Sequence, residues 1–167
     1  MSNEPLTLRP HHGMCLAYFS GHGYSGAFSA HMAATLAALT PERPVRLAAE
    51  TDEICSACPN NEGGLCSRPE RVAGYDRAVL DRCGLEEGAA LPFGAFTALV
   101  QERILAAGLR RDICGGCQWD GLCSRQPRRG AASTYRRPLF EAGPRWRRSG
   151  REGGPVFSLF SICIPAG

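Results

Sequence analysis

Apolar residues recur at helical spacing in three stretches of the chain, which predicts three amphipathic helices. The stretches cover about residues 25–40, 70–83 and 92–107. Ser25 is a suitable N-cap for the first helix, and Gly84 follows the second at a position where a left-handed residue commonly ends a helix. The apolar faces are formed by Phe28, Met32, Leu36 and Leu39; by Val72, Val79 and Leu80; and by Phe93, Phe96, Val100 and Ile104.

A shorter helix is predicted over about residues 10–19, because Pro10 fits the first turn of a helix and Gly21 follows its end. Apolar residues alternate along residues 45–49, and this pattern favours one short strand. Together these elements predict a mainly α fold with a minor short β element (small α+β). We expect a single compact domain over residues 1–125, stabilised by metal bound to cysteine-rich loops.

The regular pattern ends before residue 126. Residues 126–167 are rich in Arg, Gly and Pro without periodicity, which predicts a disordered tail. This segment holds 8 of the 19 basic residues, all of them Arg, and only 2 of the 16 acidic residues. We interpret it either as a solvated or nucleic-acid-contacting arm or as a read-through extension without selected structure. The body is mildly acidic, so nucleic acid is not expected as its partner.

Cysteine content is the feature of the composition that changes this picture, with 9 cysteines in 167 residues. No apolar run reaches the roughly 18 residues that a membrane helix needs, and the first residues lack the apolar core of a secretory signal. We therefore expect a cytoplasmic protein with no membrane partner. In a reducing cytoplasm, clustered cysteines are metal ligands or redox groups more often than disulfides.

Six of the cysteines lie in an internal repeat. Residues 52–68 read DEICSACPNNEGGLCSR, and residues 112–125 read DICGGCQWDGLCSR. A C-x2-C turn lets two thiolates converge on one ion, and the nearby glycines permit the tight backbone that returns the third sulfur. Thiolates suit Zn²⁺ and iron–sulfur clusters above other metals. The repeat cysteines are Cys55, Cys58 and Cys66 in the first copy and Cys114, Cys117 and Cys123 in the second.

Each copy supplies three sulfurs, whereas Zn²⁺ and a cubane cluster take four ligands. On a helix, Cys15 would share a face with His11, four residues before it, and with His12, three residues before it. Six repeat thiols, Cys15 and one histidine then complete two four-ligand sites. Alternatively, the two C-x2-C pairs share one cluster, and Cys66 and Cys123 are spare thiols or a redox pair.

Other residues near these motifs have structural interpretations. Cys83 ends a predicted helix and is expected to pack in the core. Trp119 is expected to cover the second cysteine loop and exclude water. Asp52, Glu53 and Asp112 adjoin the loops and fit roles as helix or turn caps.

Three motifs together, LRPHHGMCLAYFSGHGYS, DEIC-x-x-CPN and DICGGCQWDGLC, resemble the bacterial and archaeal family catalogued as domain of unknown function 1284. The resemblance spans about residues 8–125. It implies an iron–sulfur-binding protein whose cellular role is unknown, and Cys83 and Cys163 belong to none of its motifs. The ligands that it implies are Cys15, Cys55, Cys58, Cys66, Cys114, Cys117 and Cys123, with His11 and His12.

Three functions are compatible with these residues. The first is an iron–sulfur protein that transfers electrons to a redox partner protein or senses redox state, although neither loop has the ferredoxin spacing C-x2-C-x2-C-x3-C. The second is a structural zinc module that supports a protein- or nucleic-acid-interaction surface. The third is a metalloenzyme with an open position beside His11 or His12, but no P-loop, Rossmann or hydrolase motif accompanies them. The sequence leaves open whether the protein is an enzyme.

Overall fold

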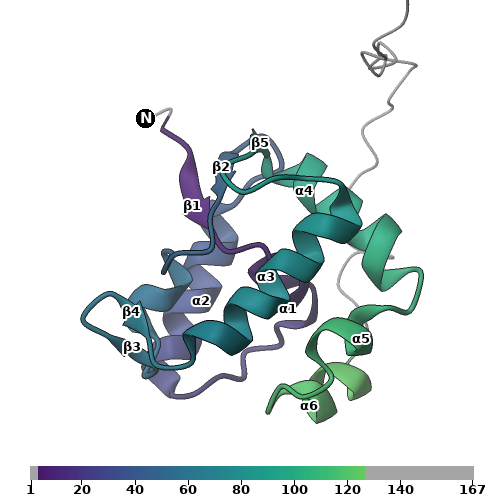
Figure 1. Cartoon of the computed structure of the whole chain (residues 1–167). Helices are drawn as coiled ribbons and strands as arrows, with labels where there is room; N and C mark the ends of the chain where they lie inside the picture. Colours follow the sequence, from purple (N-terminus) through teal and green to yellow (C-terminus); the bar gives the residue numbers. More distant parts are fainter. Residues whose placement is uncertain (1–3, 127–167) are drawn as a thin grey trace, which may run out of the picture. The chain divides into compact units, whose positions relative to one another are not determined.

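The computed structural model describes residues 4–126, and the predicted Arg-rich tail therefore lies almost entirely outside the described residues (Figure 1). The described part is mainly helical with two small sheets, as predicted. None of its helices is long and apolar enough to cross a membrane. In chain order the elements are β1 (Leu6–Leu8), α1 (His12–Tyr18), α2 (Gly26–Ala38), β2 (Pro44–Leu47), the 3-10 helix η1 (Ile54–Ala57), β3 (Asn61–Glu62), β4 (Leu65–Cys66), α3 (Pro69–Cys83), β5 (Ala90–Pro92), α4 (Phe93–Val100), the π-helical turn η2 (Gln101–Leu105), α5 (Arg110–Cys114) and α6 (Asp120–Arg125).

The four predicted helices are present as α1, α2, α3 and α4, and η2 continues α4. Ser25 caps α2 as expected, because its hydroxyl oxygen accepts a hydrogen bond of 3.1 Å from the backbone N–H of Phe28. Gly84 ends α3 with a left-handed φ of 66°. The local signals for helix ends in the sequence were therefore sufficient to place these elements.

The main sheet has three strands in the order β1-β2-β5, with β1 parallel and β5 antiparallel to β2. Only β2 was predicted, because β1 and β5 contain three residues each and are too short to show an alternating pattern. Leu8 pairs with Leu47 in the β1–β2 ladder, and both side chains are fully buried. The sheet thus contributes one apolar edge to the core and fixes where the chain enters α1.

The core joins the sheet to the helices that follow it. Helix α4 contacts α1 and α3, α3 also contacts α5, and α2 contacts η1. Most residues of the predicted apolar faces are buried in this core, with Phe96 and Ile104 fully shielded from solvent. Leu36 and Val72 are only half-buried. Cys83 is 3% exposed and packs in the core, as expected for a structural cysteine.

The prediction of a continuous loop between Cys114 and Cys123 is only partly right. Cys114 is the last residue of α5, and Cys123 lies within α6. The first repeat likewise contains η1 and a two-stranded β3–β4 hairpin. These elements have two to six residues, which is too short for a periodic pattern to show.

Close packing of α1 against α4 gives a first prediction. A Cβ at Gly13 would lie 2.5 Å from Cε1 of Phe96, whose ring is fully buried and has no room to move. We expect Gly13→Ala to lower the free energy of unfolding by about 1–3 kcal/mol, despite the better helix propensity of Ala. Urea denaturation measures this change.

Gly74→Ala is the matched control, because Gly74 lies inside α3 and a Cβ there meets nothing within 4 Å. It should raise the free energy of unfolding by about 0.5–1 kcal/mol. Equal effects of the two substitutions would contradict the close approach of α1 to the Phe96 ring.

Candidate metal centre

The residues Arg9, Pro10, His11 and His12 form the turn that joins β1 to α1. The backbone N–H of His12 donates to the carbonyl of Arg9 at 3.0 Å, and the N–H of Gly13 donates to that of Pro10 at 3.2 Å. His11 is the N-cap of α1, and His12 is its first residue. The turn therefore places two imidazoles and one guanidinium next to each other at the start of a helix.

Asp76 of α3 anchors this turn inside the protein. Its Oδ2 accepts hydrogen bonds from Nε and Nη2 of Arg9 at 2.9 and 2.6 Å. Its Oδ1 accepts from the backbone N–H of His11 at 3.0 Å and lies 2.6 Å from Nδ1 of that ring. Burial alone would raise the pKa of Asp76, but the hydrogen bonds and charges of His11 and Arg9 lower it below the usual value.

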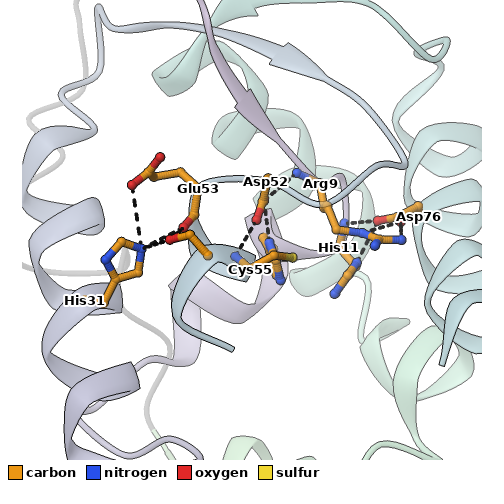
Figure 2. Close-up of polar contacts among 9 residues, drawn as sticks. Arg9, His11, His31, Asp52, Glu53, Cys55 and Asp76 are labelled. Atoms are coloured by element: carbon orange, nitrogen blue, oxygen red, sulfur yellow. Dashed lines mark hydrogen bonds and ion pairs between the residues drawn. The ribbon is translucent and has the colours of Figure 1, made fainter. Parts of the chain in front are cut away.

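Asp52 anchors the same turn from the other side. It accepts hydrogen bonds from the backbone N–H of Arg9 at 2.8 Å and from that of Cys55 at 3.0 Å, and it lies 2.6 Å from Nδ1 of His12. Burial opposes the charge of Asp52, yet His12 and the two backbone donors outweigh it and hold its pKa below the usual range. Figure 2 shows Arg9 between the Asp52 and Asp76 carboxylates.

Both histidine rings are therefore held in place before any ligand binds. The two ring centroids are 4.3 Å apart, and each side chain is 12% exposed. Burial and the neighbouring His12 lower the pKa of His11, which favours its neutral form. Asp76 holds one ring nitrogen of His11, and His12 contacts Asp52 in the same way.

His12, Asp52 and Cys55 form the tightest group of metal-binding side chains among the described residues. One ligand atom from each lies within 4.8 Å of the other two. Burial and the charge of Asp52 raise the pKa of Cys55 to about 12. A thiol with that pKa is protonated near neutral pH, so this group is a poor activated nucleophile despite its Cys, His and Asp composition.

His31 of α2 supports the segment that carries Cys55. Its Nε2 lies 2.6 Å from the backbone carbonyl oxygen of Glu53 and 3.0 Å from the hydroxyl of Ser56 (Figure 2). The N–H of Cys58 donates to the carbonyl of Cys55 at 3.0 Å and closes the C-x2-C turn. The first repeat is thus tied both to α2 and to the turn before α1.

Four further thiols act on one another electrostatically, and we call them the four-thiol group: Cys15, Cys114, Cys117 and Cys123. Burial raises the pKa of Cys15 well above its usual value, and the charges of the other three raise it further. Burial and the charges of Cys117 and Cys123 also raise the pKa of Cys114. Because such effects decline with distance, Cys15 lies within electrostatic range of the thiols of the second repeat.

Contacts between side chains agree with this arrangement. The guanidinium of Arg110 in α5 lies 5.5 Å from the ring centroid of Tyr18 in α1. The ring of Tyr24 lies 5.2 Å from that of Trp119, in an edge-on orientation. Within the repeat, the N–H of Cys117 donates to the carbonyl of Cys114 at 2.9 Å. The loop after α1 and the second repeat therefore pack side by side.

Arg110 is the positive charge beside the four-thiol group. It donates from Nη1 to Sγ of Cys114 at 3.7 Å and from Nη2 to Asp120 and Ser124 at 2.8 and 2.9 Å. This guanidinium partly offsets the effect of burial on the Cys114 and Cys123 thiols, whose pKa values nevertheless stay raised. Arg110 is 7% exposed, so its position is fixed by these contacts.

The remaining repeat cysteines lie at different places. Asn60 donates from Nδ2 to Sγ of Cys58 at 3.8 Å. Burial raises the pKa of Tyr24, and the charges of Cys58 and Cys117 raise it further. Cys66 lies on β4, where it pairs with Asn61 of the hairpin. The grouping of Cys55, Cys58 and Cys66 on one ion stays a prediction.

Sequence analysis missed three of the residues that build these sites: Arg9, Asp76 and Arg110. Asp76 did leave a signal, because it lies on the apolar face of α3, four residues before Leu80 and three before Val79. A charged residue on such a face is buried only when it is paired. Asp52 was expected to be a cap, and its hydrogen bond to the N–H of Cys55 agrees with that role.

Fold and site together define a small, mainly helical, cysteine-rich domain with a candidate metal centre. The chain belongs to the family described as protein of unknown function (DUF1284), whose model matches residues 23–123. The match includes both repeats but begins after the segment that carries His11, His12 and Cys15. No curated protein and no solved structure matches the chain.

Asp76 gives the second prediction, because removing its charge leaves the buried Arg9 guanidinium without its ion pair. We expect Asp76→Asn to lower the free energy of unfolding by about 3–5 kcal/mol, the usual effect of breaking a buried ion pair. Urea denaturation measures it. Asp81→Asn, at an exposed position of the same helix, should change stability by less than about 0.5 kcal/mol. A similar small effect at Asp76 would argue against this anchor.

Proposed function

We propose that this protein is an iron–sulfur protein whose cluster is held by Cys15, Cys114, Cys117 and Cys123. The observation that supports the proposal is the electrostatic effect of the second repeat's three thiols on Cys15, whose helix also contacts Arg110 through Tyr18. Cys15 would provide a fourth thiol where the repeat alone provides three. Four cysteine thiolates are the usual ligand set of both [2Fe–2S] and [4Fe–4S] clusters. The proposed role is electron transfer with a redox partner protein, or redox sensing.

The charge of the four-thiol group supports a cationic occupant. Burial and the charges of neighbouring thiols raise the pKa values of Cys15, Cys114 and Cys123, so these three thiols stay protonated unless positive charge is supplied. Arg110 supplies only one positive charge to this group. Iron would supply the rest, and ligation converts each thiol to thiolate.

The surroundings of the thiols fit exchange of electrons at the surface. The four cysteines are half-buried, so one side of a bound cofactor would remain close to solvent and to a partner. The paired Tyr24 and Trp119 rings shield part of the site. Arg110 donates to Sγ of Cys114, and hydrogen bonds to ligand sulfur and solvent exposure are the factors by which a protein tunes a cluster's reduction potential.

The third prediction concerns metal content. Protein purified without oxygen should be brown and contain iron and acid-labile sulfide. Cys15→Ser and Cys117→Ser should each lose most of both, because each removes one of four ligands. Cys83→Ser, which changes a core cysteine, and Cys66→Ser, which changes a thiol outside the four-thiol group, should keep them. Elemental analysis and a sulfide assay give the result.

Three outcomes would contradict the proposal. Full iron content in both Cys15→Ser and Cys117→Ser would place the cluster elsewhere. Loss of iron in Cys66→Ser would indicate that Cys66 is a ligand, so that both repeats would contribute to the cluster. A colourless protein whose zinc is lost in Cys117→Ser would instead identify a structural zinc module, the alternative that the C-x2-C turns also fit.

A further inference from the structure

We propose that His12, Asp52 and Cys55 form a second, mononuclear site for a divalent cation, separate from the four-thiol group. The three side chains come from two parts of the chain, the start of α1 and the segment around η1. Their ligand atoms lie within 4.8 Å of one another. The inference does not depend on which cofactor the four thiols hold.

The site is built before a cation arrives. The backbone N–H groups of Arg9 and Cys55 hold the two oxygens of Asp52, one each. The side chain of Asp52 is fully buried, and Cys55 is 9% exposed. A carboxylate has about four lone-pair positions, so these contacts leave Asp52 able to bind a cation. A fixed ligand set loses little conformational entropy on binding.

A divalent cation matches the charge of these ligands. The carboxylate of Asp52 and the thiolate of Cys55 bring two negative charges, and His12 binds metal as a neutral imidazole. Two positive charges make the buried assembly neutral, which avoids leaving a net charge in the interior. His12 Nδ1 lies 2.6 Å from Asp52 Oδ2, a distance at which the two atoms share a hydrogen bond.

The donor set specifies the class of metal. One nitrogen, one oxygen and one sulfur suit Zn²⁺ or Fe²⁺ better than Mg²⁺ or Ca²⁺, which prefer oxygen alone. Three protein ligands with a fourth position free for water or a substrate are typical of catalytic zinc sites. The centroid of the His11 ring, which is held by Asp76, lies 4.3 Å from that of the His12 ring.

This assignment also separates the cysteines of the first repeat. Cys55 belongs to the proposed site, whereas Cys66 lies on the β4 strand outside the group. A site made only of repeat thiols would require Cys66, and the proposed site does not. Cys66→Ser is therefore a matched control for Cys55→Ser, with the same chemical change in the same repeat.

Zinc is the probe in the experiment. The full-length protein with its native metal is dialysed against graded free Zn²⁺, and bound zinc, iron and sulfide are measured per chain. We expect one Zn²⁺ site in the wild type in addition to the iron. Cys55→Ser and His12→Gln should each weaken Zn²⁺ binding by more than about 100-fold, because each removes a ligand. Loss of a residue that only hydrogen-bonds to a ligand typically weakens binding by about 10- to 100-fold. Cys66→Ser should bind Zn²⁺ as the wild type does.

A spectroscopic measurement tests for ligation directly. Co²⁺ replaces Zn²⁺ in such sites, and a thiolate ligand gives a sulfur-to-cobalt charge-transfer band in the difference spectrum against cobalt-free protein. The band should be present in wild type and in Cys66→Ser, and absent in Cys55→Ser. Circular dichroism of each variant verifies that it is folded.

The inference is overturned if the wild type binds no Zn²⁺, or if Cys55→Ser and His12→Gln bind it as tightly as the wild type. It is also overturned if Cys55→Ser loses iron and sulfide, because Cys55 would then belong to the cluster. If the wild type contains no iron but the Zn²⁺ results are as expected, the proposed iron–sulfur function is wrong and the proposed Zn²⁺ site is supported.

Discussion

The structure depends on the burial of two carboxylates against one turn of the chain. Asp76 and Asp52 are both shielded from solvent, and both bind Arg9, one through its guanidinium and the other through its backbone N–H. A buried charge is tolerated only when it is paired and hydrogen-bonded, so these contacts can form only if α3, η1 and the β1–α1 turn meet. Segments distant in sequence are thereby fixed relative to one another.

The same turn sets the position of both candidate metal centres. His12 and Cys15 are three residues apart on α1, so they lie on neighbouring positions of one helix face. His12 lies against Asp52 of the first repeat, whereas the charges of the second repeat's thiols act on Cys15. Helix α1 is consequently a shared support, and a shift of this short helix would disturb both groups together.

How much the sequence could predict depends on how far apart in the sequence the interacting residues lie. The long helices α2 and α3 were predictable because burial of one face repeats every few residues, and their ends carry local signals at Ser25 and Gly84. The strands β1 and β5 and the helices α5 and α6 are too short for any period to show. Pairing of Asp76 with Arg9 joins residues 67 positions apart, and no local pattern encodes such a partner.

The internal repeat shows how similar local sequence can have different surroundings. Both copies contain the same C-x2-C turn, closed by the same kind of backbone hydrogen bond. In the first copy, Asp52 and Cys55 lie next to His12 of α1. In the second copy, Arg110 donates to Sγ of Cys114, and the charges of the thiols act on Cys15 of α1. The occupants proposed for the two copies therefore differ, because an imidazole and a carboxylate are harder donors than thiolate and suit a different metal.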